Sequence, residues 1–326
     1  MRTREVQFMD EQGRTTRRLA ICGALAACAL EMASCSARAG QGSAHASPAK
    51  VRGVAHLATW VWQKQAVLDP AERTILLAFA VAQGVDLLYV ADANEYEDAG
   101  FDALADLMRR AALVGIRVHL VGGDPSWARP EHHPSALALI DRVARLNGRL
   151  RRASLPEIPG VQYDVEPYAL ADWHSHPGTI ESQYVALLDE LRMSAQKAGV
   201  ELWMTIPFWF SHHPVRDTTL DRAVLDQADG VVVMAYRSTV AGVTRSAEEL
   251  LMHARERRRP VVVALEIGCA VSQESTLCGV TLPELRGALE ASRAELERFD
   301  SFEGLAVHAY AAWRSLVQAC PAEGAR

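Results

Sequence analysis

The chain of 326 residues is 49% hydrophobic and 23% charged, which is the composition of an ordinary globular protein. This length suits one large α/β domain or two smaller ones. The formal net charge of −6 favours neither nucleic acid nor an anionic membrane surface as a partner. No spacing of Cys and His residues indicates a zinc site, and we expect neither a metal nor a cofactor.

Residues 1–39 have the features of an export signal. The paired arginines Arg17 and Arg18 resemble a twin-arginine motif and precede an apolar run over residues 19–30. This run is too short to span a bilayer and fits the core of a signal peptide. We therefore expect export to the periplasm, the cell envelope or the extracellular space.

Two positions are candidates for the end of this segment. The stretch MASC, which ends at Cys35, resembles a lipobox and would leave a lipid on that cysteine as the only membrane attachment. The small residues 37–39 fit a cleavage site for soluble export instead. Residues 40–50 then form a flexible tether, and a single domain is expected over 51–326.

From residue 53 onward, strand-like and helix-like segments alternate. Eight apolar runs predict strands at 53–62, 86–92, 117–123, 160–166, 201–208, 230–237, 260–267 and 303–310. Segments with helical periodicity lie between them at 69–83, 98–114, 134–147, 180–198, 217–227, 245–258 and 281–298. Eight such units in about 260 residues predict an α/β fold of the (β/α)8 TIM barrel type with right-handed crossovers. A doubly wound sheet is the alternative, although no glycine-rich phosphate loop follows the first strand.

Aromatic residues gather at the expected carboxyl ends of the strands, where barrel enzymes place their active sites. Six of the seven tryptophans fall there: Trp60, Trp62, Trp127, Trp173, Trp209 and Trp313. Aromatic faces stack against the C–H faces of sugar rings, so this pattern predicts a carbohydrate substrate. Ordinary packing of loops is the alternative explanation. The polar residues Asp92, Asn94 and Asp124 are further candidates for contacts with a sugar.

The stretch GVQYDVEPY, residues 160–168, places two acids at the end of an apolar strand. Alternate side chains of a strand share a face, so Gln162, Asp164 and Glu166 should point into the barrel together. Burial and the neighbouring Asp164 are expected to raise the pKa of Glu166. A protonated glutamic acid near neutral pH is the general acid that glycosidic cleavage requires.

Two other strands add candidates by the same parity. Tyr236 ends the sixth strand on its inward face, and Glu266 ends the seventh. The alternative explanation is a buried network of ion pairs between the acids and Arg237.

These motifs resemble those of the chitinase-like glycoside hydrolases of family 18, which carry D-G-x-D-x-D-x-E on strand four of a (β/α)8 barrel. The stretch PGVQYDVE matches this pattern at Gly160, Asp164 and Glu166. Pro159 and Gln162 stand where the first two aspartates would be.

Three other strands carry partial matches. LVGG, residues 120–123, takes the place of S-x-G-G on strand three, and MAYR, residues 234–237, takes the place of M-x-Y-D on strand six. Tyr236 therefore matches, whereas Arg237 replaces an aspartate of the sugar-binding subsite. Trp313 takes the place of the tryptophan on strand eight.

The resemblance implies cleavage of an amino-sugar glycan with help from the substrate. Glu166 protonates the leaving glycosidic oxygen while the 2-acetamido oxygen of the substrate attacks the anomeric carbon. Asp164 orients and stabilises the acetamido group, and Tyr236 donates a hydrogen bond to it. Gln162 in place of an aspartate removes one charge behind Asp164. Gln162 and Arg237 are further candidates for contacts with the sugar.

Two further interpretations stay open. The first makes Glu166 the acid/base and Glu266 the nucleophile of a retaining glycosidase, whose two carboxyl groups lie about 5 Å apart. The second is a non-catalytic carbohydrate-binding barrel. Cys269 and Cys278 flank a loop-like stretch, which an exported protein would close with a disulfide.

Overall fold

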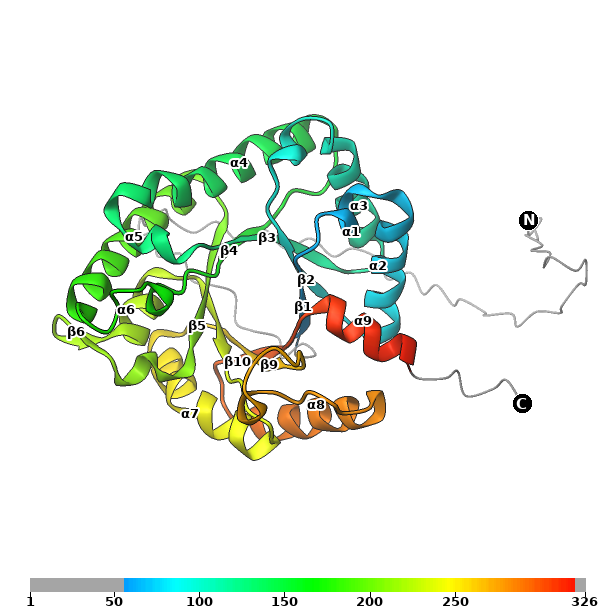
Figure 1. The fold of residues 1–326 in the computed structure, drawn as a ribbon. Helices are drawn as coiled ribbons and strands as arrows, with labels where there is room; N and C mark the ends of the chain where they lie inside the picture. Colours follow the sequence, from blue (N-terminus) through cyan, green and yellow to red (C-terminus); the bar gives the residue numbers. More distant parts are fainter. Residues whose placement is uncertain (1–55, 320–326) are drawn as a thin grey trace, which may run out of the picture. The chain divides into compact units, whose positions relative to one another are not determined.

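The computed structural model describes residues 56–319, apart from the side chain of Pro177. Eight parallel strands close into a barrel in the order β1-β10-β9-β8-β5-β4-β3-β2, and helices surround it (Figure 1). The expected (β/α)8 TIM barrel is therefore confirmed. The expected signal segment, Cys35, the tether and the first residues of the first expected strand lie outside the described residues.

Each barrel strand lies inside its expected run or within one residue of it. The strands are β1 (His56–Val61), β2 (Leu87–Ala91), β3 (Arg117–Gly122), β4 (Gly160–Tyr163), β5 (Glu201–Pro207), β8 (Gly230–Met234), β9 (Val261–Glu266) and β10 (Phe302–His308). Most of these residues are buried, because the strands meet the barrel interior on one face and helices on the other. Such strands read as nearly continuous apolar runs, which is why the sequence reveals them.

The long helices also match the expected periodic segments. They are α2 (Pro70–Gln83), α3 (Phe101–Leu113), α4 (His133–Arg152), α5 (Pro177–Ala198), α6 (Leu220–Gln227), α7 (Val240–Arg257) and α8 (Leu282–Leu296). An eighth long helix, α9 (Tyr310–Ala319), follows the last strand. Local chemistry sets several of their ends. Asp69 accepts hydrogen bonds from two N–H groups of the first turn of α2, Thr281 and Glu284 form a capping box at α8, and Gly199 ends α5 in the left-handed conformation.

Short elements were not expected from the sequence. They are α1 (Gln65–Leu68), the antiparallel pair β6 (Pro214–Val215) and β7 (Thr218–Thr219), and the 3₁₀ turns η1 (Asn94–Glu97), η2 (Pro125–Ala128), η3 (Pro130–His132), η4 (Pro167–Ala169), η5 (Phe208–His212) and η6 (Gln273–Ser275). Elements of two to five residues are too short to display a period. All of the 3₁₀ turns except η3 lie in the first part of a loop that leaves a strand at its carboxyl end.

Two apolar layers hold the domain together. The outer layer lies between the strands and the helices, and the inner layer fills the barrel. The inner layer consists of Ala58, Trp60, Leu87, Tyr89, Val121, Trp203, Val232, Val262, Ala264 and Ala306. Within residues 56–319, no helix combines the length and apolarity needed to cross a bilayer.

Candidate active site

A polar row begins inside the barrel at Gln162 of β4. Its side chain is fully buried, and its Oε1 accepts a hydrogen bond of 2.7 Å from Nε1 of Trp60 on β1. Trp60 is itself only 1% exposed. The two residues therefore form a floor inside the barrel, which corrects the expectation that both contact the sugar directly.

The row continues past the end of β4 with the two acids. Tyr163 and Val165 belong to the outer apolar layer, and the Tyr163 hydroxyl donates a hydrogen bond of 2.7 Å to a backbone oxygen of α4. Asp164 and Glu166 alternate with them and turn toward the barrel axis. Both acids are partly buried.

The backbone of β3 fixes the position of Asp164. The N–H of Asp164 donates to the carbonyl oxygen of Gly122 at 3.0 Å. At Gly123, an added Cβ would lie 1.9 Å from the carbonyl oxygen of Asp164, far inside van der Waals contact. Only glycine allows this close approach of the two chains.

Asp164 is an acid that holds its proton near neutral pH. Its pKa is raised from 3.8 to about 7, mainly by burial and secondly by the charge of Glu166, while a positive charge on His308 would oppose the shift. Its Oδ1 is buried without a hydrogen-bond partner among the described residues.

Tyr168 holds Glu166 in place. The Tyr168 hydroxyl, on η4, donates a hydrogen bond to Oε1 of Glu166. The Tyr168 ring packs edge-on against Trp209, with 5.0 Å between ring centroids. Burial and the charge of Glu166 raise the pKa of Tyr168, so its hydroxyl stays protonated and remains a donor. Tyr168 was not predicted from the sequence, although it lies only two residues after the acid.

Tyr236 lies close enough to three carboxyl groups for their charges to act on its hydroxyl. Its pKa is raised well above its ordinary value, first by burial and then by the charges of Glu266, Asp164 and Glu166. Two acids that follow β4 and one at the end of β9 thus act on one phenol. The Tyr236 hydroxyl has no hydrogen bond to any other described residue, so it is free to donate to a bound molecule.

Glu266 belongs to a chain of hydrogen bonds across the barrel mouth. Its Oε2 lies 2.7 Å from Nδ1 of His308, and the other ring nitrogen of His308 lies 3.0 Å from Nε1 of Trp62. The backbone N–H of Gly268 donates to Oε1 of Glu266 at 2.5 Å. Glu266 is almost fully buried, whereas Trp62 is partly exposed. His308 was not predicted from the sequence.

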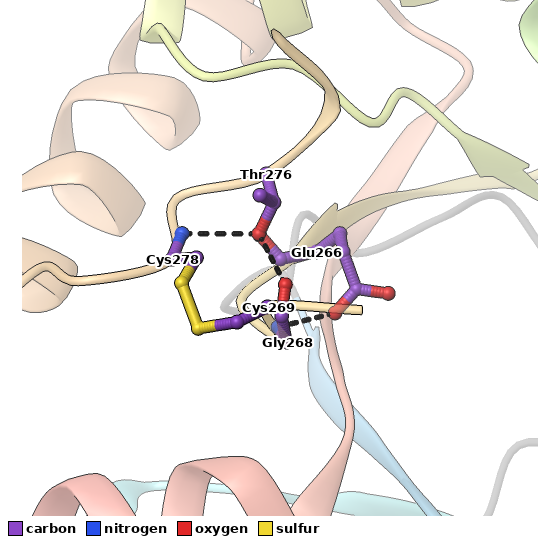
Figure 2. Close-up of a disulfide and its surroundings, with 5 residues drawn as sticks. All are labelled: Glu266, Gly268, Cys269, Thr276 and Cys278. Atoms are coloured by element: carbon purple, nitrogen blue, oxygen red, sulfur yellow. Dashed lines mark hydrogen bonds between the residues drawn. A yellow bond between two sulfur atoms is a disulfide. The ribbon is translucent and has the colours of Figure 1, made fainter. Parts of the chain in front are cut away.

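The loop after β9 is closed by a disulfide between Cys269 and Cys278, the pair expected from the sequence. Figure 2 shows that the loop turns back on Glu266. The Thr276 hydroxyl lies within hydrogen-bond distance of the carbonyl oxygens of Glu266 and Gly268, at 3.1 and 2.8 Å. The disulfide and these contacts restrain the backbone that holds the Glu266 carboxylate.

No family model and no curated protein sequence matches the chain. The barrel nevertheless matches solved structures. A GH18 chitinase from Pseudoalteromonas aurantia is similar with a TM-score of 0.55 and 12% identity, over 81% of this chain and 99% of that one. A chitinase from Bacteroides thetaiotaomicron is similar with a TM-score of 0.50 and 12% identity, over 80% and 91% of the two chains. The fold is that of the GH18 chitinases. At such low identity, the likeness establishes the fold alone.

Three of the predicted aromatic contacts do not lie at the mouth of this chitinase-like barrel. Trp313 is 1% exposed on α9, where it packs edge-on against Phe79 of α2. Trp127 packs near Tyr163 on the outer side of β4, and Trp173 is buried in the same outer layer. We correct the prediction for these residues, since a tryptophan between strands and helices cannot stack on a sugar in the barrel.

The predicted polar contacts at the ends of β2 and β3 are also structural. Asp92 pairs with Arg142 of α4 at 3.1 Å, and Oδ1 of Asn94 accepts from the same guanidinium at 2.6 Å. Burial raises the pKa of Asp92 to about 6, against the opposing effect of Arg142. Asp124 accepts hydrogen bonds from the N–H and hydroxyl of Ser126, at 2.8 and 2.5 Å, and so caps η2. These partners account for the three polar side chains without a substrate.

Arg237 lies beside the site but outside the carboxylate cluster. Its guanidinium lies 4.1 Å above the ring of Phe208, and its Nη1 donates to the backbone oxygen of Tyr236 at 2.8 Å. Among the described residues it forms no salt bridge. The alternative explanation of an ion-pair network between Arg237 and the acids is therefore wrong. Within residues 56–319, no group of three His, Cys, Asp or Glu side chains is arranged to hold a metal ion.

Proposed function

We propose that the protein is a glycoside hydrolase that cleaves a glycan containing 2-acetamido sugars. The observation that carries this proposal is the pair Asp164 and Glu166 on the inner face of the barrel mouth. One member has a pKa of about 7 and the other is held by the Tyr168 hydroxyl. Such a pair retains one proton near neutral pH, which is the condition for general acid catalysis.

The hydrogen bonds of Glu166 indicate which oxygen carries the acid proton. Because Oε1 accepts from the Tyr168 hydroxyl, the proton of the acid form belongs on Oε2, which has no partner among the described residues. This oxygen is free to address the glycosidic oxygen of a bound glycan. Tyr168 therefore acts as a positioning residue for the acid.

The reaction then follows in two steps. The acetamido oxygen of the substrate bonds to the anomeric carbon as the glycosidic C–O bond breaks, and the Oε2 proton of Glu166 passes to the leaving oxygen. Asp164 stabilises the positive charge that develops on the acetamido group, while the Tyr236 hydroxyl donates to its oxygen. In the second step, a water molecule attacks the anomeric carbon, the bond from that carbon to the acetamido oxygen breaks and restores the acetamido group, and the proton of the water passes to Glu166.

Trp62 and Trp209 are the aromatic residues that we assign to sugar contacts. Both are partly exposed. Trp62 belongs to the hydrogen-bonded chain that ends at Glu266, and Trp209 packs on Tyr168 beside the acid. Arg237 is a further candidate contact, because its guanidinium has no carboxylate partner among the described residues.

The geometry disfavours Glu266 as the nucleophile of a retaining glycosidase. One of its oxygens accepts from the backbone N–H of Gly268 and the other is bonded to His308. A nucleophile must present an oxygen to the anomeric carbon, whereas this carboxylate is buried with both oxygens engaged. We therefore assign Glu266 a positioning role.

The decisive experiment compares the full chain with Glu166→Gln. Both proteins are tested for cleavage and, separately, for binding of N-acetylated and fully N-deacetylated glucosamine oligomers. We expect the wild type to cleave the acetylated oligomer alone, and Glu166→Gln to bind it without cleavage. Glu157→Gln is the matched control, because Glu157 precedes β4 and pairs only with Arg151 on the surface.

The other outcomes favour the other assignments. Equal cleavage of both oligomers would remove the role of the acetamido group. Loss of activity in Glu266→Ala that azide restores would establish a retaining nucleophile. Binding without any cleavage by the wild type would indicate a carbohydrate-binding barrel.

We further propose that the protein acts outside the cytoplasm. The sequence of residues 1–39 supports export. The Cys269–Cys278 disulfide supports it independently, because structural disulfides persist in oxidising compartments. Fractionation of producing cells, followed by thiol labelling with and without reductant, tests both points together.

A further inference from the structure

The chain of contacts from Trp62 through His308 to Glu266 fixes the positions of two protons. An indole Nε1–H can only donate, so the His308 ring nitrogen that lies 3.0 Å from it must be an unprotonated acceptor. The single proton of the imidazole then belongs on Nδ1, which lies 2.7 Å from the Glu266 carboxylate. The contacts thus require a neutral imidazole in one tautomer.

We propose that His308 is a positioning residue that holds Trp62 as a platform for a sugar ring, and that it does so only while its imidazole is neutral. The sugar-binding part of this inference rests on the proposed function. The tautomer and the hold on Trp62 rest on the hydrogen bonds alone.

The surroundings of His308 define what protonation would change. Glu266 faces it from β9, and Asp164, from the end of β4, interacts with it electrostatically. Tyr236, two residues after β8, lies 6.1 Å away between ring centroids, and Trp60 of β1 lies 5.5 Å away. Among these neighbours, only Glu266 and Asp164 carry carboxyl groups.

Protonation breaks the contact with Trp62. A second proton on the imidazole must occupy Nε2, where it faces the Nε1–H of the indole. Two donors cannot share a hydrogen bond, so Trp62 loses its restraint. The contact with Glu266 remains and strengthens, because the imidazolium donates to a carboxylate. Neutral His308 therefore forms hydrogen bonds with both Trp62 and Glu266, whereas protonated His308 keeps only the one with Glu266.

The far end of this chain is rigid, so the change falls on Trp62. Gly268 binds the Glu266 carboxylate, and Thr276 and the disulfide restrain the same loop (Figure 2). Trp62, by contrast, is the last residue in its chain of contacts and is partly exposed. Acidification is thus expected to free the platform and leave the carboxylate in place.

The test follows the indole N–H signals of the ¹⁵N-labelled full chain by NMR between pH 8 and pH 5. Trp62→Phe assigns the Trp62 signal. We expect this signal to shift with a single transition as His308 is protonated. Trp60 is an internal control, because its indole donates to Gln162, which does not titrate, so its signal should move much less.

Three variants isolate the imidazole. His308→Gln offers one donor and one acceptor without a titrating group, so the Trp62 signal should stay at one position across the range. Glu266→Gln keeps an acceptor for the Nδ1–H without the carboxylate, so the Trp62 signal should keep its position at pH 8. Asp164→Asn should leave a transition in place, which separates the titration of His308 from that of Asp164.

The sugar-binding role has its own readout. If the wild type cleaves a glycan, its KM should rise about tenfold from pH 8 to pH 5 on the loss of one platform contact, and the rise should be absent in His308→Gln. His213→Gln is the matched control, because His213 also packs against tryptophans, Trp173 and Trp209, but donates to Glu181.

The possible failures are distinct. A Trp62 signal that ignores pH, or that titrates unchanged in His308→Gln, overturns the proposal whatever the activity. Cleavage with a KM that is the same in Trp62→Ala overturns the platform role. A signal that titrates as expected in a protein that cleaves no glycan supports the hold on Trp62 while refuting the proposed function.

Discussion

The substitution Asp164→Asn should make the protein more stable while it disables the proposed reaction. An aspartic acid whose pKa is about 7 in the folded state and 3.8 in its ordinary state binds its proton more tightly when folded. This tighter proton binding stabilises the folded state to its full extent below pH 3.8, and the stabilisation is lost as the pH rises through 7. Asparagine mimics the protonated form and does not suffer this loss.

The size of the effect follows from the interval between the two pKa values. At ~1.4 kcal/mol for each pH unit, the interval from 3.8 to about 7 corresponds to a gain in unfolding free energy of up to ~4 kcal/mol for Asp164→Asn at pH 8. At pH 4 the same variant should gain less than ~1 kcal/mol. Few single substitutions stabilise a protein this much.

Urea unfolding followed by tryptophan fluorescence, at pH 4 and at pH 8, measures this difference. Asp124→Asn is the matched control at the end of the neighbouring strand. Hydrogen bonds from Ser126 lower the pKa of Asp124, so its contribution is present above the ordinary pKa and is lost on acidification. Its substitution should destabilise the protein at pH 8. The reasoning would be refuted if Asp164→Asn were no more stable than the wild type at pH 8. It would also be refuted if the gain in unfolding free energy were the same at both pH values.

Further predictions concern activity and packing. In the wild type, kcat/KM should fall about tenfold per pH unit above about pH 7, as the pair loses its last proton, and a pH–rate profile without this limb would contradict the proton assignment. Tyr168→Phe should lower kcat about tenfold, since it removes one hydrogen bond to Glu166; unchanged kinetics would deny it a positioning role. Replacing Cys269 and Cys278 by serine should lower the unfolding free energy by about 2–3 kcal/mol for this short loop, as measured by denaturant unfolding. Trp313→Ala should lower it by about 3–5 kcal/mol and leave KM unchanged, whereas a raised KM would restore its predicted contact with the sugar.

The barrel could be predicted from the sequence because its strands are buried on both faces. Each strand is therefore an apolar run, and each run is separated from the next by a segment of helical period. The direction of Asp164 and Glu166 followed from the same regularity, because the two-residue alternation of β4 continues through both acids. Regular geometry carries this information from residue to residue along the chain.

The contacts between strands could not be predicted from the sequence, because they depend on how neighbouring strands are aligned. His308 meets Glu266 because the two residues are register partners of β10 and β9, and the sequence of either strand contains no register. Beyond the ends of β2 and β10, unlike beyond the end of β4, the alternation also stops. The sequence therefore predicted the correct end of the barrel for Asp92 and Trp313. It did not predict that their side chains pack among the surrounding helices.

The close approach at Gly123 has a consequence for how this protein can change. Any other residue at that position would push its Cβ into the carbonyl group of Asp164, so the first effect of the mutation would be a displaced Asp164 carboxyl group. In a deep mutational scan selected on activity, Gly123 should rank with the acids themselves among the least tolerant positions, although it touches neither proton nor sugar. Substitutions should therefore be tolerated in the loops around Gly123 but not at Gly123 itself.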